Sequence, residues 1–286
     1  MVELIVLDFA RGLSPRVVRA LADLERRTVA VDGGRLKLEW GVLGDRTGHQ
    51  VEDILFWDGD RLLGFLGMYG FAVPTVELAG MVDPATRRRG IATRLVDAAL
   101  PLCRERGYDR VLLVTPRAGA AGKGFALRCG AVLEHSEHAL MLTTAPADGP
   151  TDPRIRLRTA TAADAPEISR LLTAAFGRPP SEVLEALASK SERTLLVEMS
   201  GSVIGTLRAN RRGEDGGVYG FAIDPAWQGR GIGRDVLRRV CHQLREAGVQ
   251  RVGLEVAVEN EHALGLYTSI GFARVTTEDY YALPCT

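Results

Sequence analysis

The spacing of apolar residues repeats between the two halves of the chain. After each of two glycine-containing turns, apolar positions at i, i+1 and i+4 form one stripe of a predicted helix. These positions are Leu95, Val96 and Ala99 in the first half and Val236, Leu237 and Val240 in the second. Gly107 and Gly248 mark the expected helix ends. The short runs 111–114 and 252–258 then predict buried strands, so strand, turn, helix and strand recur as a unit.

The second half also shows the elements that precede its turn. Residues 155–158 alternate apolar and basic side chains, which predicts a half-exposed strand. Asp164 and Glu167 are spaced like a capping box at a helix start. The predicted core-facing stripe of that helix is Ile168, Leu171, Leu172, Ala175 and Phe176. The runs 194–197 and 203–208 flank Ser200 and Gly201 and predict a hairpin, and 218–223 predicts the strand that enters the turn. The order indicates a mixed α/β fold.

The two turns lie at one constant offset. Asp83 and Asp224, like Gly90 and Gly231, are 141 residues apart (224 − 83 and 231 − 90). Such self-similarity predicts two copies of one fold, and 286 residues suffice for two domains of ordinary size. Residues 144–153 contain three prolines and a glycine and predict an extended linker. We therefore expect an N-terminal domain at 1–143 and a C-terminal domain at 154–286.

Composition narrows the expected partners to small molecules. The 36 basic residues balance the 36 acidic ones, so no global field draws the chain to nucleic acid or to an anionic membrane. The first residues lack the features of a secretory signal and no window reaches membrane-spanning length, which predicts a soluble, cytoplasmic protein. No metal is predicted, because His135 and His138 lack an accompanying ligand pattern and the cysteines are widely spaced. The cysteines are Cys103, Cys129, Cys241 and Cys285.

The glycine-containing turns are suited to holding phosphate. A turn that runs into a helix offers backbone N–H groups without intrahelical partners, and Gly231 and Gly233 let the backbone approach a ligand closely. Arg230 and Arg234 can add charge-assisted hydrogen bonds. The competing interpretation is a tight loop with a solvated basic face. The spacing matches neither G-x-G-x-x-G nor G-x-x-x-x-G-K-[ST], which disfavours a nicotinamide or nucleoside triphosphate site.

The remaining pattern, [QR]-x-x-G-x-[GA], resembles the acetyl-CoA signature of the GNAT N-acetyltransferase superfamily. It is matched by Gln228, Gly229, Arg230, Gly231, Ile232 and Gly233, and by Arg87, Arg88, Arg89, Gly90, Ile91 and Ala92. The segment from Asn260 through Ala263, Leu266 and Tyr267 to Gly271 and Phe272 is similar to a later family motif. The tandem layout resembles the two-domain group that includes mycothiol synthase, and residues 28–33 are similar to that group as well.

The resemblance implies two GNAT-like domains, each a mixed, mostly antiparallel sheet with splayed central strands and flanking helices. It implies transfer of an acetyl group from acetyl-CoA, as co-substrate, to a small-molecule amine. The backbone N–H of Phe221 would stabilise the oxyanion, Tyr267 would protonate the departing thiolate, and Asn260 would order a water or the CoA arm. Other expected cofactor-binding residues are Ala222, Ile223 and Arg234 in the second copy and Gly80, Met81 and Val82 in the first. The competing interpretations are a packed aromatic ring for Tyr267 and a helix N-cap for Asn260.

The general base stays open. The family's usual glutamate falls at Gly217 here, which has no side chain to act. Glu214, Asp215 or Glu255 could act directly or through water, or the amine could arrive already neutral.

The offset places Gly119 opposite Asn260 and Ala126 opposite Tyr267. We therefore predict one active site, in the C-terminal domain, and a first copy that binds CoA or shapes the substrate cleft. Glu77 leaves a catalytic first copy open. The alternative functional classes are a non-catalytic acyl-CoA-binding or sensing protein and, more remotely, a nucleotide-binding oxidoreductase. Likeness to the tandem group suggests an amino-sugar conjugate or a cysteinyl compound as acceptor.

Overall fold

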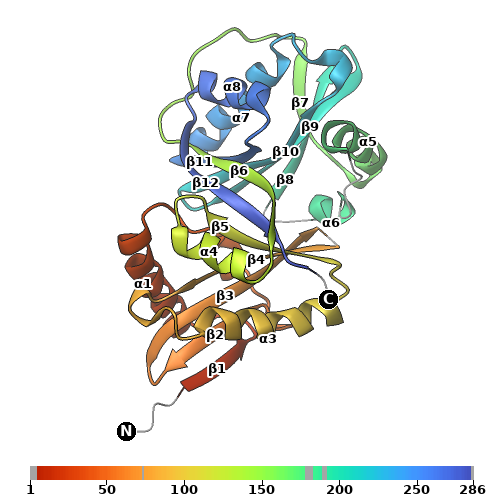
Figure 1. Ribbon diagram of the computed structural model, residues 1–286. Coiled ribbons are helices and arrows are strands. Elements are labelled where there is room, and N and C mark those ends of the chain that lie inside the picture. The colour runs from red at the N-terminus through yellow and green to blue at the C-terminus, as the bar shows by residue number, and fades with distance from the viewer. Residues whose placement is uncertain (1–4, 73, 178–182, 189–191, 285–286) are drawn as a thin grey trace. The chain divides into compact units, whose positions relative to one another are not determined.

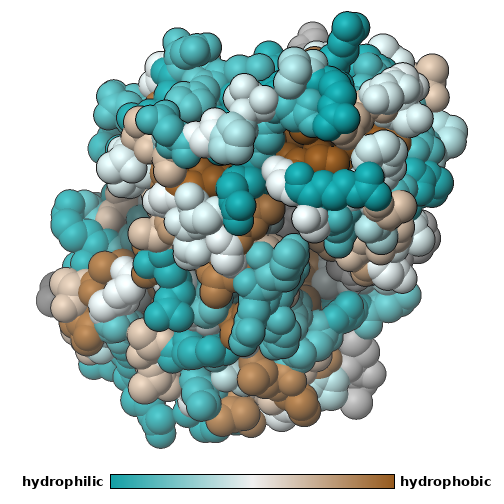
Figure 2. All heavy atoms as spheres, turned by 90° about the horizontal axis from the view of Figure 1, so that it is seen from above, coloured by the Kyte–Doolittle hydropathy of each residue, from teal (hydrophilic) through white to brown (hydrophobic). Residues whose placement is uncertain are grey.

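The computed structural model describes residues 5–72, 74–177, 183–188 and 192–284 (Figure 1). The chain divides into two compact units. Unit 1 comprises Met1–Glu137 with Thr276–Thr286, and unit 2 comprises His138–Val275. The linker predicted at residues 144–153 separates the two copies of the sequence repeat. As a domain boundary it stays a prediction. Hydrophilic side chains cover most of the face seen in Figure 2.

Unit 1 is built on one mixed sheet with the strand order β1-β2-β3-β4-β5-β12. The strands are β1 (Ile5–Ala10), β2 (Asp53–Asp58), β3 (Arg61–Ala72), β4 (Thr75–Val82), β5 (Arg110–Pro116) and β12 (Ala273–Ala282). Of these neighbours only β4 and β5 run parallel, and α3 forms the crossover between them. The helices are α1 (Pro15–Asp32), α2 (Trp40–Gly44), the short η1 (Pro84–Thr86), α3 (Ile91–Glu105) and α4 (Ala120–Arg128).

Two cores cover the two faces of this sheet. Leu21 and Leu24 of α1 pack with Leu112 and Val114 in one core. Leu95 of α3 packs in the other, with the strand residues that alternate with the first set. The side chains of α1 and α3 therefore lie on opposite faces.

Unit 2 repeats this plan with the strand order β6-β11-β10-β9-β8-β7. Its strands are β7 (Ile155–Thr159), β8 (Glu192–Met199), β9 (Ser202–Arg212), β10 (Asp215–Ile223), β11 (Arg251–Ala257) and the later part of β6 (Val132–Leu142). Strands β10 and β11 are parallel and α7 forms the crossover between them. The helices are η2 (Ala162–Asp164), α5 (Ala165–Phe176), α6 (Val183–Ala188), η3 (Pro225–Trp227), α7 (Ile232–Glu246) and α8 (Glu261–Ile270). Val252, Leu254 and Val256 of β11 share one core with α7 and α8.

The last strand of each sequence repeat is exchanged. The C-terminal strand β12 pairs antiparallel with β5, from Glu278 opposite Pro116 to Ala282 opposite Leu112, and so completes the sheet of unit 1. Strand β6, which ends the first repeat, neighbours β11 in unit 2. Each sheet therefore takes one strand from the other half of the sequence. Local periodicity does not reveal this exchange, because it reports the period of a strand and not its neighbours.

The predicted repeat of elements is confirmed, except that β11 alternates buried with exposed residues where a buried strand was expected. All six apolar residues of the helix stripes that follow the turns are buried. Gly107 and Gly248 lie two residues beyond the ends of α3 and α7 with φ of 73° and 94°. The hairpin of β8 and β9 turns at Ser200 and Gly201, where φ is 52° and 84°.

The start and stripe predicted for α5 are partly wrong. Thr161 and Asp164 form the capping box, because the Asp164 carboxylate accepts hydrogen bonds from the Thr161 backbone N–H (2.8 Å) and from Arg158. Asp164 is thus the acidic partner of this box, and Glu167 instead binds Arg170. Ile168 and Leu171 are buried as predicted, but Ala175 and Phe176 are exposed at the last turn of α5.

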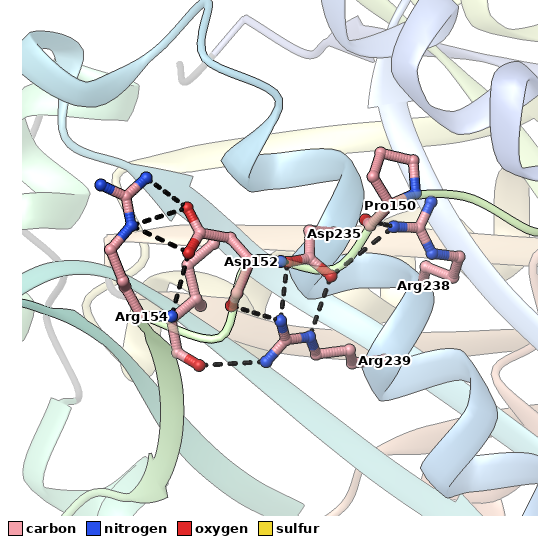
Figure 3. A network of polar contacts seen from close by, with 7 residues as sticks. Pro150, Asp152, Arg154, Asp235, Arg238 and Arg239 are labelled. Carbon is pink, nitrogen blue, oxygen red and sulfur yellow. Dashed lines mark hydrogen bonds and ion pairs between the residues drawn. The ribbon is translucent and has the colours of Figure 1, made fainter.

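The segment between Leu142 and Ile155 forms neither helix nor strand and is tied to α7 (Figure 3). The buried carboxylate of Asp235 accepts from the Asp152 backbone N–H at 2.8 Å, and Arg239 donates to the Asp152 carbonyl at 2.7 Å. The buried Arg238 donates to the Pro150 carbonyl. A Cβ at residue 149 would lie 2.1 Å from Arg238 Nη1, so a larger residue there would displace the Arg238 guanidinium. Paired buried charges therefore fix the segment to unit 2.

Candidate active site

Both phosphate-type turns adopt the same backbone geometry. Asp224 follows β10 and accepts from the Ala226 N–H at 3.0 Å, and Asp83 follows β4 and accepts from the Ala85 N–H at 3.0 Å. Gly231 and Gly90, which precede α7 and α3, both have φ of 78°. Each turn therefore leads directly into a helix whose first N–H groups have no intrahelical partners, which is the arrangement that binds anions.

The turns differ at one left-handed position. Gly229 has φ of 74°, and at the corresponding place in unit 1 Arg88 has φ of 66°. An arginine held at positive φ is strained, whereas glycine adopts this conformation freely. Both Arg88 and Arg89 are exposed. The first copy thus retains a guanidinium at a position where the second has only backbone.

The side chains of the two turns are held in different ways. Arg230 lies 5.0 Å from the ring centroid of Trp227 and donates to the Ala226 carbonyl, and Arg234 Nε donates to Ser269 Oγ at 2.8 Å. Gln228 Nε2 donates to the Ile223 carbonyl at 2.8 Å.

In unit 1, Arg87 makes a bidentate pair with Asp32 at 2.7 and 2.6 Å. Gln228 and Arg87 therefore brace their turns, while Arg88, Arg230 and Arg234 are exposed.

The parallel strands beside each turn separate, but at different points. In unit 1 the pairing of β4 with β5 ends at Ala79 and Val114, and Gly80, Met81 and Val82 continue past it. In unit 2 the pairing of β10 with β11 ends earlier, at Gly217 and Gly253. The unit 2 gap therefore spans more of its strand.

Strand β10 also carries a bulge. The register with β9 shifts between Tyr219 and Ala222, and Gly220 has φ of 54°. A bulge leaves a residue outside the hydrogen-bond ladder and re-aims its neighbours, here Phe221. The register of β4 with β3 is continuous from Tyr69–Glu77 through Gly64–Val82, which covers the corresponding stretch of unit 1. The N–H of Phe221 is thus placed differently from its first-copy counterpart.

Tyr267 is held close to the turn of unit 2. It lies on α8, whose Ser269 binds Arg234, and a Cβ at Gly233 would lie 3.0 Å from Leu266 Cδ1. Tyr267 is 9% exposed, and its ring is tilted against Phe272 at 6.2 Å between centroids. Burial raises the pKa of its phenol to about 12. The ring packs in the core as the competing interpretation expects, and the phenol stays protonated at neutral pH.

Asn260 is the N-cap of α8. Its Oδ1 accepts from the Ala263 N–H at 3.0 Å, so the alternative interpretation of this residue as a cap describes its contact here. The cap engages Oδ1, which leaves the Nδ2 group for any contact with a ligand. In unit 1, α4 begins after Gly119, which offers no side-chain cap.

The acidic candidates for a general base are now distinguished by position. Glu214 accepts from Gln250 Nε2 at 2.9 Å, and Asp215 binds Arg251 at 2.6 Å, both at the start of β10. Glu255 lies on β11 beyond the last residue paired with β10, and it alternates with core residues that pack against α7. A Cβ at Gly217 would lie 2.3 Å from the Tyr219 hydroxyl, so a larger residue there would have to displace the Tyr219 side chain.

A cleft of about 450 Å³ lies in unit 1. All the predicted first-copy binding residues except Arg89 line it. Its wall also includes Thr28, Val29, Asp32 and Gly33 from the segment 28–33, and Lys37, which the sequence analysis did not single out. In unit 2, a cavity of about 300 Å³ between β8, β9 and α7 contains none of the predicted site residues. The larger of these two cavities therefore lies in unit 1, which has Ala126 at the position of Tyr267.

The described residues contain no group of three or more His, Cys, Asp or Glu side chains placed to hold a metal ion. Cys103, Cys129 and Cys241 are free thiols, and Cys285 lies outside the described residues. Within the same part of the chain, no helix has the length and apolar composition needed to cross a membrane.

Comparison with known proteins agrees with this geometry. The model of the acetyltransferase (GNAT) family matches residues 20–131 and 165–272. A mycothiol acetyltransferase of Thermobispora bispora is 30% identical, over 94% of this chain and 96% of its own, and one of Rhodococcus jostii is 31% identical, over 91% and 92%. A solved GCN5-related N-acetyltransferase of Sphaerobacter thermophilus shares the fold, with a TM-score of 0.80 at 21% identity over 97% of this chain and 95% of that one.

These relatives decide between the functional classes that the sequence left open, in favour of an enzyme over a non-catalytic binding protein or an oxidoreductase. The chain belongs to the GNAT acetyltransferase family and is an acyltransferase with two tandem GNAT domains.

Proposed function

We propose that the protein transfers the acetyl group of acetyl-CoA to the primary amine of a small molecule, and that the transfer occurs in unit 2. The observation that carries this assignment is the buried phenol of Tyr267, on the helix bound to the first turn of α7. Unit 1 has a roomier cleft but offers Ala126 at that position. Cavity volume measures room for a ligand, whereas repeated transfer to a free amine is faster with a hydrogen-bond donor near the leaving sulfur. We therefore assign catalysis to unit 2, because it contains the donor Tyr267.

In this proposal the coenzyme diphosphate is bound by the backbone amides from Gly229 to Arg234, with the guanidiniums of Arg230 and Arg234 beside it. The pantetheine arm follows β10 past Ile223 and Ala222. The thioester carbonyl accepts from the N–H of Phe221, which the bulge removes from the strand ladder. The acyl group thereby lies where β10 and β11 separate.

Tyr267 acts on the sulfur. Its pKa of about 12 lies above that of a free thiol, about 8.5, so complete proton transfer from the phenol to the thiolate is uphill. The phenol instead donates a hydrogen bond as the C–S bond breaks. The proton that ends on sulfur balances the one that the attacking nitrogen loses.

Glu255 is the proposed general base. Of the three candidates, Glu214 and Asp215 lie at the far end of β10, beside Gln250 and Arg251. Glu255 lies past the last β10–β11 pair, on the side of the sheet away from α7, and its side chain is exposed. It would take a proton from the amine directly or through one water.

The acceptor class follows from the relatives. The proteins that are 30% and 31% identical over nearly their whole length are named mycothiol acetyltransferase. We accordingly propose a mycothiol-related acceptor, and among such compounds a cysteinyl amino-sugar conjugate with a free primary amine.

The test is thiol release from acetyl-CoA with a panel of amines. Tyr267→Phe retains the packed ring, and it is expected to lower turnover by about 10²-fold, because it removes one hydrogen bond to the developing thiolate. Tyr281→Phe, which alters a buried tyrosine of unit 1, is the matched control and should leave turnover unchanged. With the native enzyme, the rate should show no loss from phenol ionisation below about pH 11, since the pKa of Tyr267 is about 12. Full activity of the Phe variant would remove Tyr267 from the mechanism.

A further inference from the structure

Lysine is rare in this chain, and one lysine lies in the cleft of unit 1. Of the 36 basic residues only three are lysines, Lys37, Lys123 and Lys190. Lys37 contributes to the cleft wall and its side chain is 6% exposed. Buried lysine is uncommon unless it is paired, and unlike arginine it can lose its proton and act as a nucleophile.

Lys37 is held by groups that accept protons. Its Nζ lies 3.4 Å from Glu77 Oε2 and donates to the Tyr280 hydroxyl at 2.6 Å. The Tyr280 hydroxyl in turn donates to Glu137 Oε2 at 2.8 Å. The Lys37 amine therefore has the Glu77 carboxylate beside it, and the Tyr280 hydroxyl connects it to a second carboxylate, that of Glu137.

The strand register places this amine where the strands of unit 1 separate. Glu77 of β4 lies opposite Leu112, and Tyr280 of β12 lies opposite Val114. Strand β5 lies between β4 and β12, so an amine that binds both residues spans β5 at the level of residues 112–114. The last β4–β5 pair is Ala79 with Val114. Of the two partners of Lys37, Tyr280 is level with that last pair and Glu77 lies two pairs before it.

The cleft reaches both faces of the sheet at this opening. Leu95 and Val96 of α3 line it from one face, and Leu38 and Phe65, which pack in the α1 core, line it from the other. The turn at Arg88 and Gly90 also belongs to its wall. A coenzyme bound at that turn would extend its acyl end through the opening toward the α1 face, where the Lys37 amine lies.

We infer that Lys37 is an internal acyl acceptor, so that acetyl-CoA bound in the unit 1 cleft acetylates its Nζ. This inference rests on the proposed use of acetyl-CoA. The ammonium first gives a proton to Glu77, or through Tyr280 to Glu137. The free electron pair of Nζ then attacks the thioester carbonyl carbon, the C–S bond breaks, and the second proton lost by nitrogen ends on the CoA sulfur. The products are acetyl-Lys37 and free CoA, with no change in oxidation state.

The competing explanation is that Lys37 only fastens β12 to unit 1 through Tyr280 and Glu77. The two differ in a measurable way. A structural ion pair predicts an unmodified Lys37 in the presence of acetyl-CoA, whereas an acceptor predicts an amide at this one lysine.

The experiment incubates the intact chain with acetyl-CoA and no amine, and maps acetylation at the three lysines by peptide mass spectrometry. We expect close to one acetyl group at Lys37 and at least about tenfold less at Lys123, which lies outside the cleft wall. Lys190 lies outside the described residues and serves as a second internal reference. Glu77→Gln should slow acetylation of Lys37 by about tenfold or more, as loss of a base does. Lys37→Arg should abolish the modification and leave amine acetylation in unit 2 intact.

Calorimetric titration separates the two ways in which the inference can fail. Arg88→Glu should remove one of two acetyl-CoA binding events and abolish Lys37 acetylation. If two molecules bind and Lys37 stays unmodified, Lys37 is no acceptor, although the coenzyme site stands. If the native chain binds acetyl-CoA only in unit 2, the unit 1 coenzyme site is wrong and the inference falls with it. Loss of acetylation in Tyr267→Phe would assign the modification to unit 2 and also overturn it.

Discussion

The two turns of this protein differ far less than the sites they belong to. Gly90 and Gly231 have the same φ of 78°, and Asp83 and Asp224 accept the same backbone hydrogen bond at 3.0 Å. These features concern only the backbone and its cap. They suit a phosphate, because the backbone amides at a helix start are its main hydrogen-bond donors.

The chemistry beside the turns has diverged. Unit 2 has a buried phenol with a raised pKa, a capped α8 and a bulge in β10 between Tyr219 and Ala222. Unit 1 has Ala126 and Gly119 in the corresponding places, and the register shift of β4 lies earlier, between Thr75 and Glu77. The comparison indicates that holding a coenzyme and catalysing transfer are separable in this fold. Binding needs a backbone conformation, and catalysis needs a few side chains around the thioester.

The largest effect that tests this comparison is expected from Glu255. Glu255→Gln removes the proposed base of unit 2 and is expected to lower kcat/KM for the amine by about 10²-fold or more. The rate should recover when the pH is raised far enough for the amine to be neutral without a base. Steady-state kinetics against pH measures both.

Asp215→Asn is the matched control, because Asp215 is bound by Arg251 at the start of β10. It should change kcat/KM by less than about twofold, as surface substitutions do. If the Asn and Gln variants lose the same activity, Glu255 has no special role and the amine reaches the thioester already neutral.

How far the sequence predicts the site depends on the kind of feature. Periodicity and the constant offset predicted both turns and the helices after them, because local backbone and core-facing stripes are encoded by nearby residues. The exchange of β12 and β6 was missed, since strand neighbours depend on contacts far apart in the chain. A fragment of residues 1–143 would therefore lack β12 and cannot represent unit 1.

The contacts of single polar residues were also beyond the sequence. Asn260 matched a motif, but only the structure shows that Oδ1 caps α8. Lys37 carried no motif, and its place beside Glu77 and Tyr280 joins three segments, one of them near the C-terminus. The rarity of lysine in this chain is the one feature of the sequence that could have drawn attention to Lys37.

A second test compares Asp53 of β2 with Thr194, its counterpart 141 residues later on β8. Asp53 is fully buried beside Arg46, and burial raises the pKa of its carboxyl to about 6. Between about pH 4 and pH 6 the native state keeps a proton that the unfolded chain loses, so stability falls as the pH rises. The expected loss is on the order of 2 kcal/mol by pH 7. Denaturant unfolding at about pH 4.5 and pH 7 measures it.

Asp53→Asn should abolish this dependence. Thr194→Val should retain it, because a threonine does not titrate and its buried Oγ1 has no hydrogen-bond partner among the described residues. A native chain that is equally stable at both pH values would show that Arg46 keeps Asp53 ionised, and that the buried charge pair is balanced within unit 1.

The smallest effect concerns the one residue at which the turns differ in strain. Arg88→Gly removes the strain of an arginine in the left-handed region, which should stabilise the fold by about 1 kcal/mol. Glycine also raises the conformational entropy of the unfolded chain, which destabilises the fold by about the same amount, so the free energy of unfolding should change by less than about 0.5 kcal/mol. Affinity for acetyl-CoA in unit 1 should nevertheless fall by about tenfold, through loss of a charge-assisted contact with phosphate. Gly229→Arg in unit 2 adds the strain and should destabilise by about 1 kcal/mol. Denaturant unfolding of both variants measures the change in stability, and calorimetric titration measures the change in affinity for acetyl-CoA. If Arg88→Gly stabilises unit 1 without loss of affinity, the strain at Arg88 has no part in binding, and the first turn is only a structural copy of the second.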